Sequence, residues 1–367
     1  MGEVRPARVD VDLSAIRDNV AALVQTATPA RLCAVVKADG YGHGDVPVAE
    51  AALAAGAEWL AVALVEEGVR IREAGIDAPM LLLAEPPPAD AAEVVRWDLI
   101  PTVYQSEFME AVERAAPAGY PIHIKIDTGM HRVGAPRKVA LELARRAVSS
   151  DLALEGLWTH FAVADADEEF TRGQLEQFID FVETLAAEGI RAPLAHAANT
   201  AGTLAYPEAR LDMVRVGLGI YGLRPAPGLG SDTPLRPAMR VSSSVLYVQR
   251  LPAGSRPSYG RRRPLGREST VATVPVGYAD GLVRRLPQTG GEVLIRGRRY
   301  PFAGTVTMDQ VVIDLGDDPV DIGDEVVLLG RQGGEEVTAE EWADRLDTIN
   351  YEIVCGFGPR MPRQHLR

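Results

Sequence analysis

Lys37 is the first residue whose type and position suggest chemistry. It follows the apolar run 33–36 and precedes a glycine-rich segment that contains Tyr41 and His43. Partial burial at a strand end lowers the pKa of an ammonium and frees a nucleophilic amine, as a Schiff base requires. A solvated lysine at a strand end is the alternative. Gly217, two residues after Arg215, offers backbone N–H groups to a phosphate. Together these features predict pyridoxal phosphate as the cofactor.

The elements that must position these residues alternate in the first 225 positions, where short apolar runs follow helical patterns. We expect an α/β fold, a closed (β/α)8 TIM-type barrel, with a doubly wound open sheet as the alternative. A barrel carries its site at the carboxyl ends of the strands. The expected strands are Leu32–Val36, Leu60–Ala63, Met80–Leu83, Leu99–Val103, Ile122–Ile126, Leu154–Trp158, Leu194–His196 and Met213–Val216. The expected helices are Leu13–Val24, Ala89–Val95, Glu107–Ala115, Lys138–Val148 and Arg172–Ala187.

A proline- and glycine-rich stretch at 224–237 predicts a linker to a second domain. Val- and Ile-rich segments without a long helix between them then favour a mostly antiparallel β domain. We therefore expect a barrel over residues 1–230 and a β domain over 231–367. The expected strands are Met239–Leu251, Val271–Val276, Glu292–Ile295, Val311–Leu315 and Glu325–Leu329. One late helix is expected at Ala339–Leu346, because Thr338 and Glu341 have capping-box spacing.

Composition narrows the function classes. The 367-residue chain has a net charge of −13 and no basic stripe, which argues against a nucleic-acid partner. Two cysteines, Cys33 and Cys355, are too few for a disulfide framework or a zinc cluster, so no metal site is expected. Neither a signal-peptide core nor a bilayer-spanning apolar run is visible, so we expect a cytoplasmic protein with no membrane partner.

Seven motifs in order resemble those of bacterial alanine racemases (fold type III). The segment that resembles their pyridoxal-phosphate attachment motif is Val36-Lys37-Ala38-Asp39-Gly40-Tyr41-Gly42-His43-Gly44. The others are Asp127-Thr128-Gly129-Met130-x-Arg132-x-Gly134, Thr159-His160-Phe161-Ala162-x-Ala164-Asp165, Arg215-x-Gly217-x-x-x-Tyr221-Gly222, Val276-Gly277-Tyr278-Ala279-Asp280-Gly281, Thr307-Met308-Asp309-Gln310 and Asn350-Tyr351-Glu352. The family has a (β/α)8 barrel followed by a β domain. The resemblance implies interconversion of L- and D-alanine, which supplies D-alanine for peptidoglycan.

The resemblance implies two catalytic bases, Lys37 on one face of the cofactor and Tyr278 on the other. One base removes the α-proton and the other delivers one. His160 and Arg215 are expected to stabilise the phenolate of Tyr278. The resemblance also implies a head-to-tail homodimer, in which each site takes Lys37 from one chain and Tyr278 from the other.

Arg215 is expected to face the pyridine nitrogen of the cofactor. A guanidinium does not give up its proton near neutral pH, so the ring nitrogen stays unprotonated and the cofactor withdraws fewer electrons. Transamination is then suppressed. An acidic residue at this position would instead suit the related decarboxylase-type barrels.

The remaining expected site residues bind the cofactor or the substrate. The set that resembles the family's phosphate-binding residues is Tyr41, Asn199, Thr200, Gly217, Leu218 and Tyr351, although Asn199 and Thr200 also fit a helix cap. Arg132 is expected to hold the substrate carboxylate and the cofactor's phenolic oxygen, and Met308 to contact substrate through its backbone amide. Lys125 matches a position that is carbamylated in some members. A chloride ion beside Arg132 or a solvated lysine are the alternatives.

Some positions depart from the family pattern or have no assigned role. Thr307 replaces a frequent cysteine, and Thr305 an arginine that some members carry at the entrance corridor. These departures concern substrate access. His43 and His196 are expected to serve packing or loop hydrogen bonding. A broader-specificity (serine) racemase of the same fold is the alternative enzyme. A pyridoxal-phosphate carrier is another class, but single-domain relatives of that kind lack the β domain that carries Tyr278 and Met308.

Overall fold

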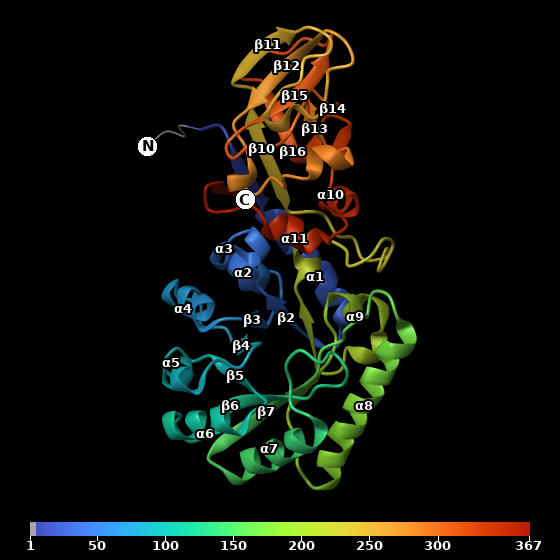
Figure 1. Ribbon diagram of the computed structural model, residues 1–367. Coiled ribbons are helices and arrows are strands. Elements are labelled where there is room, and N and C mark those ends of the chain that lie inside the picture. Colours follow the sequence, from blue (N-terminus) through green and yellow to red (C-terminus); the bar gives the residue numbers. More distant parts are fainter. Residues whose placement is uncertain (1–4) are drawn as a thin grey trace. The chain divides into compact units, whose positions relative to one another are not determined.

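The computed structural model describes residues 5–367, and the chain divides into two compact units (Figure 1). One unit comprises residues 14–40 and 44–237. The other comprises residues 41–43 and 238–367 together with the chain up to Leu13. The observed division therefore differs from a boundary at residue 230 mainly at the start of the chain. There β1 (Arg8–Asp12) pairs with two strands of the second unit, β10 (Met239–Ser244) and β18 (Arg363–Leu366).

Eight parallel strands form the nearly closed barrel that the apolar runs predict. Their spatial order is β8-β7-β6-β5-β4-β3-β2-β9. Backbone hydrogen bonds from Asp212 N to Ala195 O (3.1 Å) and from Arg215 N to Ala198 O (2.9 Å) join the ends of β8 and β9. The strands are β2 (Arg31–Val35), β3 (Trp59–Val62), β4 (Met80–Leu82), β5 (Ile100–Val103), β6 (Tyr120–Lys125), β7 (Leu152–Trp158), β8 (Leu194–His196) and β9 (Met213–Val216).

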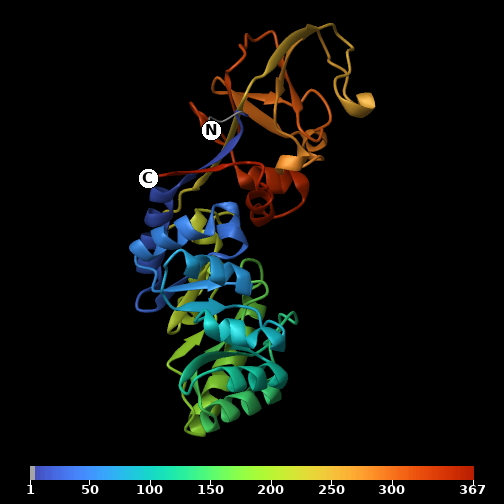
Figure 2. The ribbon, with the colours of Figure 1, turned by 90° about the vertical axis from the view of Figure 1, so that its left-hand side faces the viewer.

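Helices cover the outside of this barrel (Figures 1 and 2). Helix α6 illustrates why they form: Phe108, Met109 and Val112 lie on one buried face, Glu107 is in the first turn and Arg114 in the last. The helices are α1 (Leu13–Ala27), α2 (Lys37–Gly42), α3 (Asp45–Ala54), α4 (Val65–Glu73), α5 (Ala91–Arg96), α6 (Ser106–Ala115), α7 (Arg137–Ser149), α8 (Glu168–Ala187) and α9 (Thr200–Ala205). Short 3-10 turns are η1 (Pro88–Asp90), η2 (Pro207–Ala209) and η3 (Leu218–Tyr221).

The second unit contains the expected antiparallel strands in two sheets. One has the order β14-β13-β16-β10-β1-β18, with β17 beside β16, and the other has the order β11-β12-β15. Only the β1–β18 pair is parallel among these described strands. The further strands are β11 (Tyr247–Leu251), β12 (Ser269–Val274), β13 (Glu292–Ile295), β14 (Arg298–Pro301), β15 (Val311–Gly316), β16 (Glu325–Gln332) and β17 (Glu335–Val337). The 3-10 turns are η4 (Tyr259–Arg261), η5 (Tyr278–Asp280) and η6 (Leu286–Thr289).

One expected strand is wrong. The run Met239–Leu251 forms β10 and β11, which lie in different sheets. The break follows Ser244, where Val245 N donates to Asp324 O and Leu246 N donates to Thr273 O, so two tertiary contacts redirect the chain.

The late helix α10 (Ala339–Leu346) is confirmed. Thr338 Oγ1 accepts a hydrogen bond from Glu341 N at 3.0 Å, as expected for a capping residue. The shorter α11 (Asn350–Cys355) follows it. None of the helices in residues 5–367 is long and apolar enough to cross a membrane.

Candidate active site

The segment after Lys37 has a left-handed backbone. The φ angles of Ala38, Asp39, Gly40 and Tyr41 are 53°, 52°, 57° and 51°. Left-handed backbone costs an L-residue roughly 1–2 kcal/mol at each position. Such strain persists where surrounding contacts enforce it, and it is concentrated at functional sites.

Glu67 on α4 enforces this conformation at the first strained residue. Its Oε1 accepts from Ala38 N at 2.7 Å, and its Oε2 accepts from Ala63 N and Leu64 N at 2.8 and 3.1 Å. Because Glu67 is buried, both oxygens depend on these N–H groups. The carboxylate thus ties the residue after Lys37 to the end of the neighbouring strand β3.

The loop after β6 is held by Asp127. Its Oδ1 accepts from Gly129 N and His131 N at 3.0 and 3.1 Å, and its Oδ2 lies 3.0 Å from His131 Nδ1. Burial acts to raise the pKa of Asp127, but these hydrogen bonds outweigh it and lower the pKa below its usual value. The folded loop presents Arg132 in an exposed position.

Gln174 on α8 connects this loop with the next one. Its Nε2 donates to Thr128 Oγ1 at 3.3 Å and to His160 O at 3.2 Å, and its Oε1 accepts from Ala162 N at 2.9 Å. The hydroxyls of Thr128 and Thr159 lie 2.7 Å apart. One buried amide therefore fixes the segments that carry Arg132 and His160.

Arg215 on β9 is buried and held on three sides. Its Nη2 donates to Thr159 O at 2.8 Å and to Ala197 O at 3.0 Å, and its Nη1 donates to His196 Nδ1 at 2.7 Å. Burial lowers the pKa of the guanidinium to about 9, so Arg215 stays protonated at neutral pH. Its Nε–H has no acceptor among the residues that the structure describes, and it remains available to a ligand.

His160 is neutral in this environment. Burial, and next the positive charge of Arg215, hold the pKa of His160 well below its usual value. Arg215 Nη2 lies 3.3 Å from His160 Nδ1. A guanidinium only donates, so Nδ1 accepts and the ring proton is on Nε2.

Lys125 ends β6 and is also buried. Its Nζ lies 4.2 Å from the ring centroid of Trp158. Burial, followed by the positive charges of Arg215 and Arg132, lowers the pKa of Lys125 to about 7. A large part of the population is therefore uncharged at neutral pH, which is the form that reacts with carbon dioxide.

The barrel unit thus brings its predicted ionisable residues together at one mouth. Lys37, Arg132 and Arg215 act electrostatically on both Lys125 and His160. This concentration of positive charge occurs in a chain of net charge −13. The donors suit a ligand with a phosphate and a carboxylate.

The expected phosphate-binding residues of the barrel follow β8 and β9. Asn199 Oδ1 accepts from Gly202 N at 2.9 Å and caps α9. Thr200 Oγ1 lies 3.4 Å from Gly219 N, which joins the two loops. Gly217 precedes η3, and the first N–H groups of such a turn have no acceptor within it.

Tyr278 and Met308 lie together in the second unit. Tyr278 N donates to Thr307 O at 3.0 Å and Ala279 N donates to Met308 O at 3.1 Å. A Cβ at Gly277 would lie 2.2 Å from Met308 O, so only glycine permits this approach. Both side chains are exposed, Tyr278 by 42% and Met308 by 52%.

Tyr41 and Tyr351 also belong to this unit, and their ring centroids are 6.2 Å apart. Burial raises the pKa of Tyr41 above its usual value, and the adjacent Tyr351 adds to the shift. Tyr41 therefore keeps its hydroxyl proton at neutral pH and can donate it to an anion.

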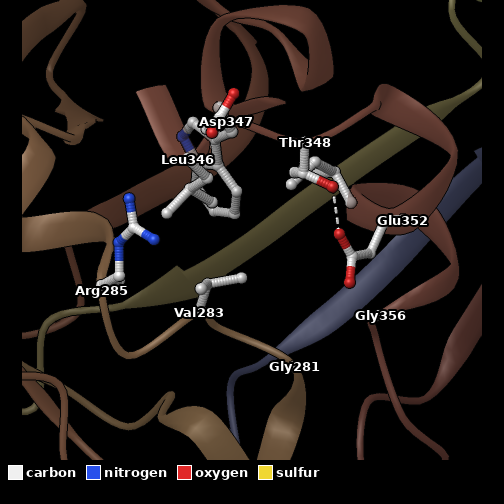
Figure 3. Close-up of a pocket in the computed structure, with 10 residues that line it drawn as sticks. Gly281, Val283, Arg285, Leu346, Asp347, Thr348, Glu352 and Gly356 are labelled. Atoms are coloured by element: carbon white, nitrogen blue, oxygen red, sulfur yellow. Dashed lines mark hydrogen bonds between the residues drawn. The ribbon is translucent and has the colours of Figure 1, made fainter. Parts of the chain in front are cut away.

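A cavity of about 330 Å³ is lined by residues that are close in sequence to Tyr278 and Tyr351, but neither tyrosine lines it. Gly281, Val283 and Arg285 form one side, and the connection from Leu346 to Glu352 forms the other (Figure 3). Thr348 donates a hydrogen bond to Glu352 across that connection.

Two family models match almost the whole chain. The alanine racemase N-terminal domain matches residues 11–225, and the alanine racemase C-terminal domain matches residues 238–365. The chain belongs to the alanine racemase family.

Curated relatives in this family match over their full length. An alanine racemase of Symbiobacterium thermophilum is 47% identical and one of Halothermothrix orenii is 41% identical, each over 98% of this chain and 97% of the relative. The alanine racemase structure from Streptomyces coelicolor is 39% identical and has a TM-score of 0.94, over 99% of both chains. A Bacillus anthracis alanine racemase structure described with bound L-Ala-P is 37% identical and has a TM-score of 0.93, over 100% of this chain and 96% of that one. Because these relatives are alanine racemases, the serine racemase alternative finds no support.

Three residues that hold the site in place were not identified from the sequence motifs: Glu67, Gln174 and His196. Glu67 and Gln174 are acidic or amide residues in helical segments, which from sequence alone indicate a solvated face. His196 was expected to serve packing or loop hydrogen bonding, and it also bonds Arg215. The His43 ring has the expected loop role, since its Nδ1 lies 2.9 Å from Tyr41 O.

Proposed function

We propose that this protein interconverts L- and D-alanine by a two-base mechanism that uses pyridoxal phosphate. The observation that carries the proposal is the cluster of buried and half-buried cations at the barrel mouth around Lys37, in a chain that matches alanine racemases throughout its length. The buried cations suit an anionic cofactor.

The chain's own groups fit pyridoxal phosphate at both ends. Lys37 would attach it, and the Nε–H of Arg215 would face the ring nitrogen. The hydroxyls and backbone amides that would hold the phosphate belong to Tyr41, Asn199, Thr200, Gly217, Leu218 and Tyr351. When bound, the cofactor withdraws electrons from the amino acid and makes its α-proton acidic.

Lys37 and Tyr278 would each move one proton at the α-carbon, from opposite faces. The Lys37 amine accepts a proton from one enantiomer, while the Tyr278 hydroxyl delivers one to the other face, and the roles reverse for the reverse reaction. His160 supports the tyrosine through its Nε2–H, which remains free to donate because Nδ1 accepts from Arg215.

Arg132 and the backbone amide of Met308 would orient the substrate. The arginine can donate two hydrogen bonds and the amide one, which suits a carboxylate. We also propose that Lys125 is carbamylated, since its depressed pKa favours the reactive amine. The resulting negative charge would balance the neighbouring arginines.

We further propose a cytoplasmic head-to-tail homodimer with alanine as its small-molecule substrate and D-alanine for peptidoglycan as its product. The two sites would each take Lys37 from one chain and Tyr278 from the other. Tyr278 and Met308, large and exposed on the second unit, support this assembly.

The test is incubation of the full-length protein with L-alanine in deuterated water. Circular dichroism should fall to zero, and mass spectrometry should detect deuterium only at the α-carbon. L-serine under the same conditions should react much more slowly. Loss of optical activity without α-deuterium, or no loss with cofactor bound, would contradict the proposal.

A further inference from the structure

A row of polar side chains runs from Arg215 to the surface of the barrel, and the mechanism proposed above does not use it. Arg215 Nη1 lies 2.7 Å from His196 Nδ1, and His196 Nε2 lies 2.9 Å from His123 Nδ1. His123 Nε2 lies 3.6 Å from Glu155 Oε2. Both imidazoles are fully buried, whereas the Glu155 side chain is 29% exposed. The row therefore runs from a buried cation to a half-buried carboxylate. Its last step is not a hydrogen bond, because Glu155 Oε2 and His123 Nε2 are both buried and neither has a hydrogen-bond partner within residues 5–367.

Arg215 fixes the direction of the hydrogen bonds in this row. A guanidinium only donates, so His196 Nδ1 accepts and the proton of that ring is on Nε2. This Nε2–H then donates to His123 Nδ1, which puts the proton of His123 on Nε2, facing Glu155. Both rings are neutral in this arrangement. Burial lowers the pKa of each histidine below its usual value, which agrees with neutral rings.

The aligned rings stabilise the cation without a carboxylate touching it. Each imidazole turns its electron-rich Nδ1 along the row toward Arg215 and its N–H toward Glu155, so the two dipoles add. Among residues 5–367 no carboxylate forms an ion pair with Arg215. A carboxylate in direct contact would offset its charge and occupy its N–H groups, whereas the row leaves the Nε–H available.

The backbone next to His123 leaves space for its imidazole ring. Strand β6 pairs Ile122 with Leu154 and then His123 with Gly156, so Glu155 is the extra residue of a bulge in β7. Bulges redirect side chains at functional sites. A Cβ at Gly156 would lie 2.3 Å from His123 Nδ1, so the glycine makes room for the imidazole.

We propose that Glu155 and His123 are positioning residues for Arg215. His123 accepts from the His196 Nε2–H and so holds the ring of His196, whose tautomer Arg215 dictates. Glu155 lies beyond His123, and His196 in turn holds the guanidinium that would face the cofactor's ring nitrogen. The last step rests on the proposed function, whereas the tautomers do not. Trp158 assists by stacking on His196, with ring centroids 5.7 Å apart and planes within 8°.

The test is ¹⁵N NMR of the full-length protein with labelled histidines, with turnover measured in parallel. In the wild-type protein His123 and His196 should both have the Nε2–H tautomer at neutral pH. His123→Leu removes the acceptor of the His196 Nε2–H, so the His196 Nε2 signal should shift as that hydrogen bond is lost, while Arg215 keeps the proton on Nε2. His123→Asn places an amide oxygen near the position of Nδ1 and should preserve the wild-type His196 signals.

Turnover should follow the hydrogen bond from His196 Nε2 to residue 123. His123→Leu should lower kcat roughly tenfold with little change in KM, as loss of about one hydrogen bond predicts, and His123→Asn should restore most of it. Glu155→Gln removes the negative charge that faces the His123 Nε2–H and should lower kcat less, by roughly threefold. The matched control is Glu113→Gln, because Glu113 is comparably exposed (22%) and bonded to Arg146 on the outer helices. It should behave as wild type.

The proposal is overturned if wild-type His196 carries its proton on Nδ1, or if the Leu and Asn variants share one His196 Nε2 signal and one kcat. Should His123→Leu fail to fold, Glu155→Gln decides: unchanged His123 signals and unchanged kcat overturn the proposal. Expected tautomers in a protein that binds cofactor but does not racemise alanine would instead refute the proposed function.

Discussion

Lys125 and Arg215 are both buried, and both are cations at low pH. Each lies over the indole of Trp158, with Nζ and Cζ 4.2 and 4.4 Å from its centroid. Cation–π contacts and backbone carbonyls offset part of the cost of burial. The positive potential that remains favours the binding of anions. This is why the barrel mouth, rather than the 330 Å³ cavity of the second unit, is assigned as the site.

Lys37→Ala should abolish both cofactor attachment and racemisation, because the variant lacks the attaching amine. The chain has three lysines, Lys37, Lys125 and Lys138, so attachment can be mapped without ambiguity. Borohydride reduction and peptide mass spectrometry should place the cofactor on Lys37 in the wild type. Lys138→Ala on the exposed face of α7 is the control and should retain both properties. A reduced adduct on Lys125 in an active Lys37→Ala variant would refute the assignment.

Lys125 should make stability depend on pH when its amine is unmodified. Its folded pKa, about 7, lies below the value of 10.5 for a free lysine, so the unfolded chain binds more protons between these limits. The free energy of unfolding should therefore rise with pH from 7 toward 10.5, by up to ~1.4 kcal/mol per pH unit. Below pH 7 the full penalty for burying the charge applies.

Urea unfolding with and without bicarbonate checks this dependence. In bicarbonate-free buffer, the difference between wild type and Lys125→Met should shrink as pH rises from 7. If the lysine is carbamylated, bicarbonate should make this difference in unfolding free energy less dependent on pH. Mass spectrometry under native conditions should then detect the carbamate. A constant difference in both buffers would mean that Lys125 does not titrate in the folded protein.

At the scale of elements, the barrel strands were predictable because most of their residues are apolar and buried. The same criterion failed at Met239–Leu251, where one run supplies strands to two sheets. No glycine or proline marks the break after Ser244, and its position depends on the remote partners Asp324 and Thr273. Strand β1, which lies between β10 and β18, was missed because both partners lie more than two hundred residues later.

The candidate site was predictable where chemistry follows a strand in sequence, as with Lys37, Lys125 and Arg215. Supports such as Glu67 and Gln174 were not predictable, because they reach the site through tertiary contacts. In sequence each resembles an ordinary polar residue of a solvated face. Only coordinates reveal that these polar groups connect neighbouring elements.

Glu67→Gln should loosen the connection between α4 and the strained turn at Ala38. In glutamine only the amide oxygen can accept. Its NH2 group would therefore face either the N–H of Ala38 or the N–H groups of Ala63 and Leu64. We expect a loss of roughly 1–3 kcal/mol in the free energy of unfolding and weaker cofactor binding, because Lys37 is less well held. Thermal unfolding and cofactor titration measure both. Glu66→Gln, at the neighbouring exposed position on α4, should change neither, and equal effects of the two substitutions would contradict this role.

At the scale of the whole molecule, the two proposed bases belong to different units. Lys37 lies in the barrel unit and Tyr278 in the β unit. A site that needs both can form within one chain or between two. A two-fold dimer gives two equivalent sites if each chain supplies both residues to different sites.

Mixing two inactive variants distinguishes these arrangements. Lys37→Ala and Tyr278→Phe should each be inactive, because each lacks one of the two bases. If subunits exchange at equal amounts, about half of the dimers are mixed, as random two-fold pairing requires. Each mixed dimer has one site with both substitutions and one with neither, so roughly a quarter of the wild-type activity should return. If both residues came from one chain, every site would keep one substitution. A mixture that stays inactive, with exchange verified by co-purification of a tagged subunit, would therefore refute the shared site and leave the two-base chemistry intact.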